Sequence, residues 1–339
     1  MKTKSLALFF LLLNIAISNL IGWDYEVHRV INQLALASLP TNFPAFILSD
    51  QARERIAFLS GEPDRWRNTP ELELRHQNHP DHYFDYEYLE MHRIKPQELP
   101  SFRYEFVSML ALTRAAHPKN FPPIDPLKNA DKTRELPGFL PWTINEYYGK
   151  LKSQFSLLKE FEENGTEEEI KNARENVIYI MGVMGHFVGD ATQPLHTTKH
   201  FNGWAGDNPN NYTTSTKFHS WIDGGYFEKV GINKEGLLSK IKPVAPLREP
   251  SQTNKPDNLF PDIMEFFLQQ HSLVEPLYKL EKEGKLSGEG ERGLEGKQFL
   301  EEQLLKAAQM LGNLWLTAYQ QAPRDNFLRD QLLKRKNRK

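Results

Sequence analysis

The sequence contains no cysteine among its 339 residues. This absence excludes disulfide bonds, iron–sulfur clusters, cysteine-based zinc fingers and thiol catalysis. Any metal ion would therefore have to be bound by histidine, carboxylate or backbone groups.

An excess of charge of one sign is also lacking, because 42 lysine and arginine residues balance 44 aspartate and glutamate residues. Such a chain has no global basic field to attract a nucleic-acid backbone and no acidic field to repel one. Its 39% hydrophobic and 12% aromatic content is sufficient for a sizeable core. Net charge alone therefore says nothing about the substrate.

Long hydrophobic runs are scarce, and the one that stands out lies at the amino terminus. Two lysines precede the apolar run 6–17, which is the order of a secretory signal. A membrane anchor is the alternative, but the run is shorter than the ~20 apolar residues that a spanning helix needs. We therefore expect a signal peptide at 1–22 and export to a periplasmic, extracellular or other secretory compartment. Leu20 and Gly22 form only a partial cleavage site before Trp23.

Apolar residues recur at helical spacing through most of the remaining chain. The clearest segments are 101–116, 166–189 and the amphipathic segment 299–321. The second of these opens with TEEE, a threonine cap followed by an acidic first turn. No segment alternates with period two, so we predict an all-α fold, a single compact multi-helix domain with long loops.

Neither an internal repeat nor a domain boundary is visible in the sequence. The predicted organisation is one domain over 23–325, followed by a solvated basic tail at 326–339. Loops rich in proline, asparagine and aspartate are expected at 61–100, 118–141, 197–218 and 241–259, with a charged, glycine-spaced linker at 281–297.

Histidine and aspartate gather in the segment 185–196, which reads GHFVGDATQPLH. Residues four apart lie on one helix face, so His186 and Asp190 can converge on one point, and so can His219 and Asp223. A single histidine–aspartate pair at this spacing usually forms only a hydrogen bond between the two side chains on the helix surface. The first pair, however, lies in an apolar stretch, where an unpaired imidazole and carboxylate would cost roughly several kcal/mol unless a cation satisfied both.

The same stretch has glycine at positions 182, 185 and 189. Glycine inside a helix costs about 1 kcal/mol relative to alanine. Three such residues predict close backbone packing against this helix.

These motifs resemble those of the three-zinc phosphodiesterase superfamily. The resemblance rests on HFVGDATQPLH, on FHSWID with His219 twenty-three residues after His196, and on Trp23 and His28 near the expected mature start. The superfamily contains the fungal and plant single-strand-specific nucleases, which are also 3'-nucleotidases, and the bacterial zinc-dependent phospholipases C. The resemblance implies the all-α fold of these enzymes and three zinc ions per chain.

The resemblance also implies a ligand set for each zinc ion. The first set is Asp64, His82, His186 and Asp190. The second set is the amino group and carbonyl oxygen of Trp23, together with His28 and the same Asp190, which is shared with the first set. The third set is His196, His219 and Asp223. His82 is assigned in preference to His76 or His79 because HYFD resembles the His-aromatic-x-Asp pattern of the family. The unassigned histidines, expected to be surface or loop residues, are His92, His117, His200 and His271, of which His200 lies nearest the motif.

In this arrangement the shared Asp190 would lie between two zinc ions that hold a bridging water. The pKa of such a water falls from 15.7 to about 7, and the resulting hydroxide attacks the phosphorus in line. The third ion neutralises charge on the phosphate and on the leaving group. The resemblance thus implies Asp190 and Asp64 as the catalytic carboxylates. It also implies that Trp23 binds zinc only after the preceding peptide has been removed.

The class of substrate is less defined than the metal chemistry. Tyr83 and Asp85 correspond to residues beside the base pocket of the nucleases, although related lipases have a similar run. Asp223 and the spacing from Trp23 to His28 are those of the nucleases, whereas their Gly-Gly-Asn loop is absent.

We therefore expect a secreted, monomeric zinc phosphodiesterase. Of the two branches of the superfamily, we favour the nucleases, and thus an endonuclease with 3'-nucleotidase activity on single-stranded DNA, RNA or nucleotides. The enzyme alternative is a phospholipase C acting on phospholipid headgroups. The non-enzyme alternative is a structural or zinc-sequestering protein. No protein partner is implied.

Overall fold

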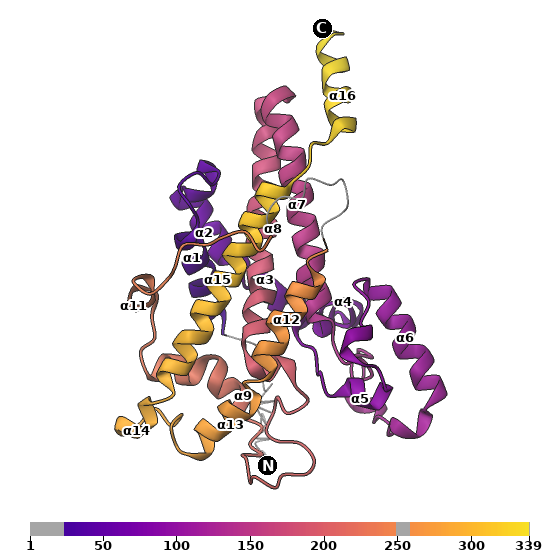
Figure 1. Ribbon diagram of the computed structural model, residues 1–339, viewed down its shortest axis with the longest axis vertical. Coiled ribbons are helices and arrows are strands. Elements are labelled where there is room, and N and C mark those ends of the chain that lie inside the picture. The colour runs from indigo at the N-terminus through magenta and orange to yellow at the C-terminus, as the bar shows by residue number, and fades with distance from the viewer. Residues whose placement is uncertain (1–23, 249–257, 339) are drawn as a thin grey trace, which may run out of the picture.

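The structure, a computed structural model, describes residues 24–248 and 258–338 (Figure 1). Within these residues every regular element is a helix or a helical turn, and the β-type pairing is a single bridge between Phe84 and Gly138. The all-α prediction is confirmed. No helix among the described residues is long and apolar enough to cross a membrane. The signal peptide predicted at 1–22 and the predicted ligand Trp23 lie outside the described residues.

Four helices form the centre of the molecule: α1 (Tyr25–Ser38), α7 (Leu140–Asn164), α8 (Glu167–Thr192) and α15 (Lys297–Gln321). Helices α7 and α8 pack along each other as an antiparallel hairpin, and α1 and α15 pack against them (Figure 1). The helix predicted at 166–189 begins with the predicted cap, because Thr166 and Glu169 bond each other's backbone N–H groups. Residues of these helices, such as Leu34, Val177 and Leu311, are fully buried in the core.

The glycines of α8 allow other helices to approach it closely. A Cβ atom at Gly182 would lie 2.6 Å from Cβ of Leu59, in α2 (Asp50–Leu59). A Cβ atom at Gly189 would lie 2.7 Å from Nδ1 of His28, in α1. The close packing predicted for this stretch is therefore confirmed, and it brings α1 and its histidine against α8.

The predicted loop at 61–100 is wrong. It contains α3 (Glu62–Arg67), α4 (Leu72–Asn78) and α5 (Tyr88–His92), helices of 6, 7 and 5 residues. Segments of one or two turns are too short to show a helical period in the sequence. The predicted linker at 281–297 is likewise interrupted by α14 (Gly290–Leu294).

The other predicted loops are largely irregular. Residues 118–139 contain only short 3₁₀ turns, and no helix is found between 198 and 217. Of 241–259, the described residues 241–248 and 258–259 are not helical. The remaining helices of the carboxyl half are α9 (Phe218–Ser220), α10 (Tyr226–Lys229), α11 (Lys234–Leu238), α12 (Phe260–His271) and α13 (Val274–Lys282).

A lobe of α4, α5 and α6 (Arg103–Ala116) lies beside the helical centre (Figure 1). The lobe is joined to α7 by stacked aromatic rings, since the centroids of Phe106 and Trp142 are 4.2 Å apart. The indole N–H of Trp142 also donates to the carbonyl oxygen of Pro100 at 2.9 Å. The segment predicted as a helix at 101–116 is therefore α6, and it belongs to this lobe.

The expected basic tail begins with a helix, α16 (Asn326–Lys336), at the opposite end of the molecule from α9 and α13 (Figure 1). The guanidinium group of Arg335 lies 2.7 Å from the carboxylate of Glu169, at the start of α8. Part of the segment predicted to be a solvated tail is thus a helix attached to the body of the protein.

Candidate metal centre

Helix α8 positions the two central side chains of the centre. His186 and Asp190 are one turn apart and fully buried, and Nε2 of His186 lies 3.2 Å from Oδ2 of Asp190. Nδ1 of His186 lies 2.7 Å from the carbonyl oxygen of Ser60, which can only accept a hydrogen bond. Nδ1 therefore carries the proton, and Nε2 presents its lone pair toward Asp190.

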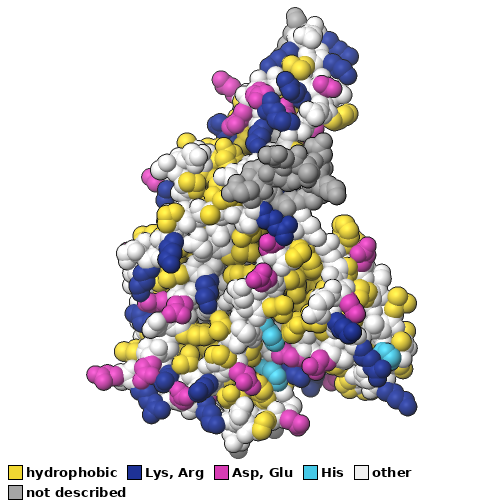
Figure 2. Space-filling model, in the orientation of Figure 1, with side chains coloured by type: hydrophobic (Ala, Val, Ile, Leu, Met, Phe, Trp, Pro, Cys, Tyr) yellow, Lys and Arg dark blue, Asp and Glu magenta, His cyan; other side chains and the backbone are white. Residues whose placement is uncertain are grey.

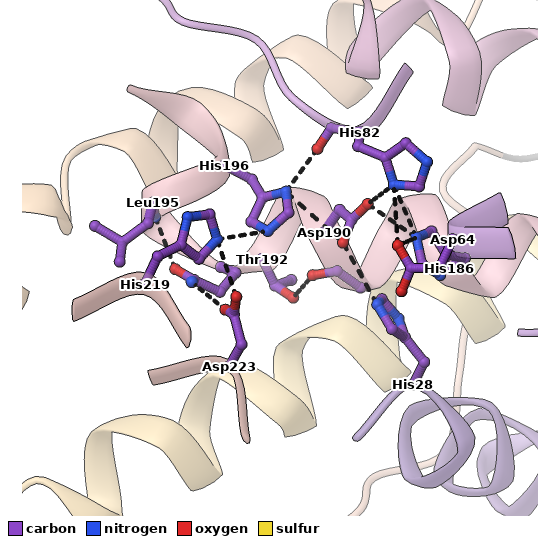
Figure 3. A network of polar contacts seen from close by, with 12 residues as sticks. His28, Asp64, His82, His186, Asp190, Thr192, Leu195, His196, His219 and Asp223 are labelled. Carbon is purple, nitrogen blue, oxygen red and sulfur yellow. Dashed lines mark hydrogen bonds and ion pairs between the residues drawn. The ribbon is translucent and has the colours of Figure 1, made fainter. Parts of the chain in front are cut away.

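The carboxylate of Asp190 lies in the middle of the centre (Figure 3). Oδ2 is 2.9 Å from Nδ1 of His82, and Oδ1 is 3.4 Å from Nε2 of His28 and 3.7 Å from Nδ1 of His196. Together with His186, four histidines from four separate segments surround this one carboxylate. A carboxylate shared by two cations would need this position.

A first group of donor atoms consists of Asp64, His82 and His186. Asp64 belongs to α3, and His82 ends a 3₁₀ turn, η2 (His79–His82). Nε2 of His186 lies 2.9 Å from Nδ1 of His82 and 3.8 Å from Oδ1 of Asp64. Two ring nitrogens so close must share either a proton or a cation; nitrogen ligands of a tetrahedral zinc ion lie roughly 3.3 Å apart.

A second group consists of His28, His186 and Asp190. The ring of His28, from α1, stacks on that of His186 with centroids 3.9 Å apart. This contact depends on Gly189, because a side chain there would collide with the ring of His28. The glycine in the motif therefore has a direct role in forming the centre.

A third group consists of His196, His219 and Asp223 (Figure 3). His196 lies in a 3₁₀ turn, η6 (Pro194–Thr197), and Asp223 in η7 (Trp221–Gly225), a single turn of π-helix. Nε2 of His219 lies 3.1 Å from Nε2 of His196 and 3.0 Å from Oδ2 of Asp223. Short π-helical turns are frequent at functional sites because they change the direction of side chains.

The start of the described chain lies beside this third group. The backbone N–H of Asp24 donates to the carbonyl oxygen of Asp223 at 3.1 Å. Asp24 directly follows Trp23, which itself lies outside the described residues.

Members of all three groups have buried polar atoms without a hydrogen bond. Within the described residues they include both ring nitrogens of His28, Nε2 of His82, Nδ1 of His219, and one carboxylate oxygen each of Asp64, Asp190 and Asp223. An unsatisfied buried polar group costs about 1–3 kcal/mol. Cations would satisfy these lone pairs, and a donor set of imidazole nitrogen and carboxylate oxygen is one that zinc prefers. The residues therefore fit zinc, although the number of ions does not follow from the geometry.

Most histidines of the centre are held neutral. Burial, reinforced by the Arg67 guanidinium, lowers the pKa of His82 to about 3. Burial also lowers the pKa values of His28 and His196. Neutral imidazole is the form that binds a metal ion.

His186 and the two carboxylates of the centre shift one another's pKa values. Burial opposes a charge on His186, but the carboxylates of Asp190 and Asp64 outweigh it and raise the pKa of His186. Burial would raise the pKa of Asp190, but attraction by His186 and His196 lowers it well below its usual value. The pKa of Asp64 is lowered to about 2, because the attraction of Arg67 and His186 outweighs the effect of burial. Both carboxylates are therefore ionised at neutral pH.

Two residues of the centre were not found from the sequence. Arg67 is buried, its Nε lies 2.6 Å from Oδ1 of Asp64, and its Nη2 has no hydrogen-bond partner among the described residues. The side-chain N–H of Gln193 donates to Oδ1 of Asp223 at 2.6 Å. The spacing of three residues between Asp64 and Arg67 is the signal that could have identified the first.

The predicted substrate-binding residues Tyr83 and Asp85 directly follow His82 but belong to none of the three donor groups. Asp85 is buried, and burial together with the nearby Glu87 raises its pKa well above the usual value. Burial likewise raises the pKa of Tyr83, which is half-buried. The carboxyl of Asp85 is thus enclosed, and its environment disfavours the charged form.

The other histidines lie outside the three donor groups. His76 and His79 contact Asp131, at 2.7 Å from its carbonyl oxygen and 3.6 Å from its carboxylate. The four histidines expected at the surface or in loops also belong to none of the groups, but two of them, His92 and His200, are buried.

No family model and no curated protein matches the sequence. A search of solved structures matched the crystal structure of an alpha-toxin of Clostridium perfringens from the avian strain SWCP, with 13% sequence identity and a TM-score of 0.32. The match covers 89% of this chain and 64% of that one, so the chain spans less than two thirds of the toxin's length. A TM-score of this size does not establish a shared fold, and the chemistry of the centre follows from its own side chains.

Proposed function

We propose that this protein is a zinc-dependent phosphodiester hydrolase. The observation that carries the proposal is the carboxylate of Asp190, which contacts four histidines and connects the donor groups in one buried centre. A structural zinc site is usually a closed set of four ligands around one ion. Adjacent groups that share a carboxylate favour instead a catalytic centre with more than one ion, as in many phosphoesterases.

The residues proposed to bind zinc are those implied by the resemblance, namely Trp23, His28, Asp64, His82, His186, Asp190, His196, His219 and Asp223. Zinc bound there would supply a hydroxide at neutral pH and positive charge opposite the phosphate. The chain itself orients the ligands. Ser60 fixes the tautomer of His186, and the carbonyl oxygen of His82 fixes that of His196 through its Nδ1 at 2.6 Å.

Arg67 is proposed to bind a phosphate oxygen of the substrate. Its Nε forms an ion pair with Asp64, and neither Nε nor Nη2 has a hydrogen bond in the described part of the chain. A buried guanidinium group with an unused donor is well suited to phosphate, because a charged hydrogen bond is roughly twice as strong as a neutral one.

Phospholipid headgroup esters are the substrate class that we favour, in preference to the nuclease activity expected from the sequence. Recognition of a base would require an accessible carboxylate at Asp85, and this carboxyl group is buried and its pKa is raised. The loop from 198 to 217 also lacks the Gly-Gly-Asn of the nucleases. The nuclease remains the second candidate, supported by Asp223 and by the position of Tyr83 next to His82.

One set of assays tests these proposals. The zinc-loaded mature chain would be incubated with phosphatidylcholine, single-stranded DNA, 3'-AMP and a small activated phosphodiester. We expect hydrolysis of the small ester and release of phosphorylated headgroups, both lost by at least ~10³-fold in Asp190→Asn. Asp131→Asn is the control, since Asp131 is also buried but contacts none of the three groups.

Cleavage of DNA and 3'-AMP without lipid hydrolysis would replace the phospholipid proposal with the nuclease. Zinc binding without hydrolysis of any of the four substrates would contradict an enzymatic function and favour a structural or sequestering role.

A further inference from the structure

Exposed apolar side chains concentrate on the lobe that contains α6. Among the described residues, four of the five most exposed large hydrophobic side chains are Phe102 at 68%, Tyr104 at 83%, Leu112 at 71% and Leu127 at 93%. Isolated exposed apolar residues are normal on a protein surface, but a contiguous group marks an interaction site. In Figure 2 hydrophobic side chains gather over the lobe at the right of the view, with lysine and arginine at its lower corner.

Helix α6 has two apolar faces rather than one. Its residues Phe106 and Leu110 are buried within the lobe, so the helix already has a core-facing side. Tyr104, Leu112 and the small residues between them lie on the opposite side and are exposed. We define this second face, the α6 stripe, as Tyr104, Ser108, Ala111, Leu112 and Ala115. An amphipathic helix of a monomeric protein does not need such a stripe for its own stability.

The segment that comes after α6 in the sequence contains three lysines without an ion-pair partner among the described residues. Lys119, Lys128 and Lys132 are exposed, and among the described residues no carboxylate lies within 4.0 Å of their amino groups. Residues 111–134 contain five lysine and arginine residues but only two aspartates, of which Asp131 is bound by Arg75. This segment, rather than the whole lobe, therefore carries a local excess of positive charge in a chain whose total charge is close to zero.

Apolar side chains beside unpaired lysines are suited to an anionic lipid surface. Leucine and tyrosine insert at the level of the headgroups, while lysine extends its amino group to the phosphates. A second copy of this chain is a poorer occupant, because it would bring the same lysines toward one another. We propose that the lobe formed by α6 and residues 117–132 binds the surface of an anionic phospholipid bilayer.

Helix α6 contacts the segment that carries His82 of the centre. Nη1 of Arg103, in the first turn of α6, lies 2.6 Å from the carboxylate of Asp81, which directly precedes His82. A bilayer bound at the α6 stripe would thus be held at a fixed distance from the centre. The inference goes beyond the proposed hydrolase function, since binding to a bilayer requires neither metal nor hydrolysis.

Sedimentation with lipid vesicles tests the proposal. The mature chain, treated with a chelator so that lipid is not cleaved, would be mixed with vesicles of phosphatidylcholine alone or with added phosphatidylserine. We expect stronger binding to the mixed vesicles and a decrease with salt, because the lysines contribute through charge.

Two double variants separate the contributions of the lobe. Leu112→Ser with Leu127→Ser is expected to weaken binding by roughly tenfold or more through lost apolar insertion. Lys119→Gln with Lys128→Gln is expected to weaken it about fivefold per lysine, and only on vesicles that contain phosphatidylserine. The matched controls are Leu294→Ser and Lys242→Gln, exposed residues of the same types outside the lobe.

Circular dichroism and hydrolysis of the small phosphodiester by the zinc-loaded variants verify that the variants fold. Binding of the leucine double variant equal to that of Leu294→Ser would overturn the proposal, as would absence of wild-type binding to mixed vesicles. If the wild type dimerises with rising concentration and Leu112→Ser abolishes this dimerisation, a second copy of the chain occupies the α6 stripe. This result would also overturn the proposal.

Discussion

Asp190 is the residue whose loss should affect more than one metal ion. Its two carboxylate oxygens contact histidines of all three donor groups. We expect the mature wild-type chain to bind about three zinc ions, and Asp190→Asn to lose more than one equivalent. Metal analysis after gel filtration measures this, with Asp131→Asn as the control. Loss of one equivalent or less would show that Asp190 is not shared.

Arg67 should affect the use of substrate more than the content of metal. Removal of one charged donor to a reacting oxygen costs about 10²–10³-fold in rate. We therefore expect Arg67→Gln to lower kcat/KM by at least ~10²-fold, while most of the zinc is retained. Arg65→Gln, in the same helix but exposed, is the control and should change kcat/KM by no more than a few fold. Equal rates in the two variants would refute a role of Arg67 in binding phosphate.

At the scale of single helices, glycine has opposite roles in α7 and α8. A Cβ atom at Gly182 would lie 2.8 Å from the carbonyl oxygen of Ile56, whereas no heavy atom lies within 4 Å of a Cβ atom at Gly149. Gly149→Ala is expected to stabilise the protein by about 0.5–1 kcal/mol. Gly182→Ala is expected to destabilise it by about 1–3 kcal/mol, because α2 must move. Urea denaturation measures both, and the same sign for both would contradict the close packing of α2 on α8.

The long helices could be predicted from the sequence, but the short elements could not. Helix α8 has a cap, an apolar period and 26 residues, and each of these signals is local. Helices α3 and α5 are too short for a period, and the π-helical turn of Asp223 has no sequence signature. The spacing of four residues predicted the pairs His186–Asp190 and His219–Asp223. The approach of η2 and α1 to α8 results from tertiary packing, which spacing does not show. The complete donor sets therefore came only from a family resemblance. The burial of Asp85 depends on residues far away in the sequence, since its backbone N–H donates to the carbonyl oxygen of Pro137. The residues around Asp85 in the sequence therefore could not predict it.

For the whole molecule, histidines whose pKa values are lowered by desolvation predict a loss of stability in mild acid. Burial lowers the pKa of His79 and of His92 to about 4, below the unfolded value of 6.5. The unfolded chain therefore binds protons first, and stability is present above pH ~6.5 and lost as the pH falls toward 4. We expect His92→Gln to reduce this dependence, as measured by unfolding free energies between pH 7 and 4.5. An unchanged slope would show that His92 does not contribute.

The amino terminus should control the proposed hydrolase activity. The position of Asp24 beside Asp223 supports the proposal that a free amine at Trp23, produced by export and cleavage, completes the centre. A chain that retains one residue before Trp23 is expected to lose nearly all activity, because an amide nitrogen cannot replace an amine ligand. The rate for the small phosphodiester and the zinc content would be compared with those of a chain starting at Trp23. Full activity with the extension would rule out this ligand.

The continuous helix α8 also limits which changes in chain length the centre can tolerate. One residue inserted between His186 and Gly189 would rotate everything beyond it by about 100° and shift it by ~1.5 Å. Asp190 would then leave the face shared with His186, and Gly189 would no longer oppose His28 of α1. A residue inserted between 198 and 217 would lengthen only an irregular segment between the proposed ligands His196 and His219. Insertions and deletions in the loop 198–217 are therefore compatible with the geometry of the centre, whereas those inside α8 are not.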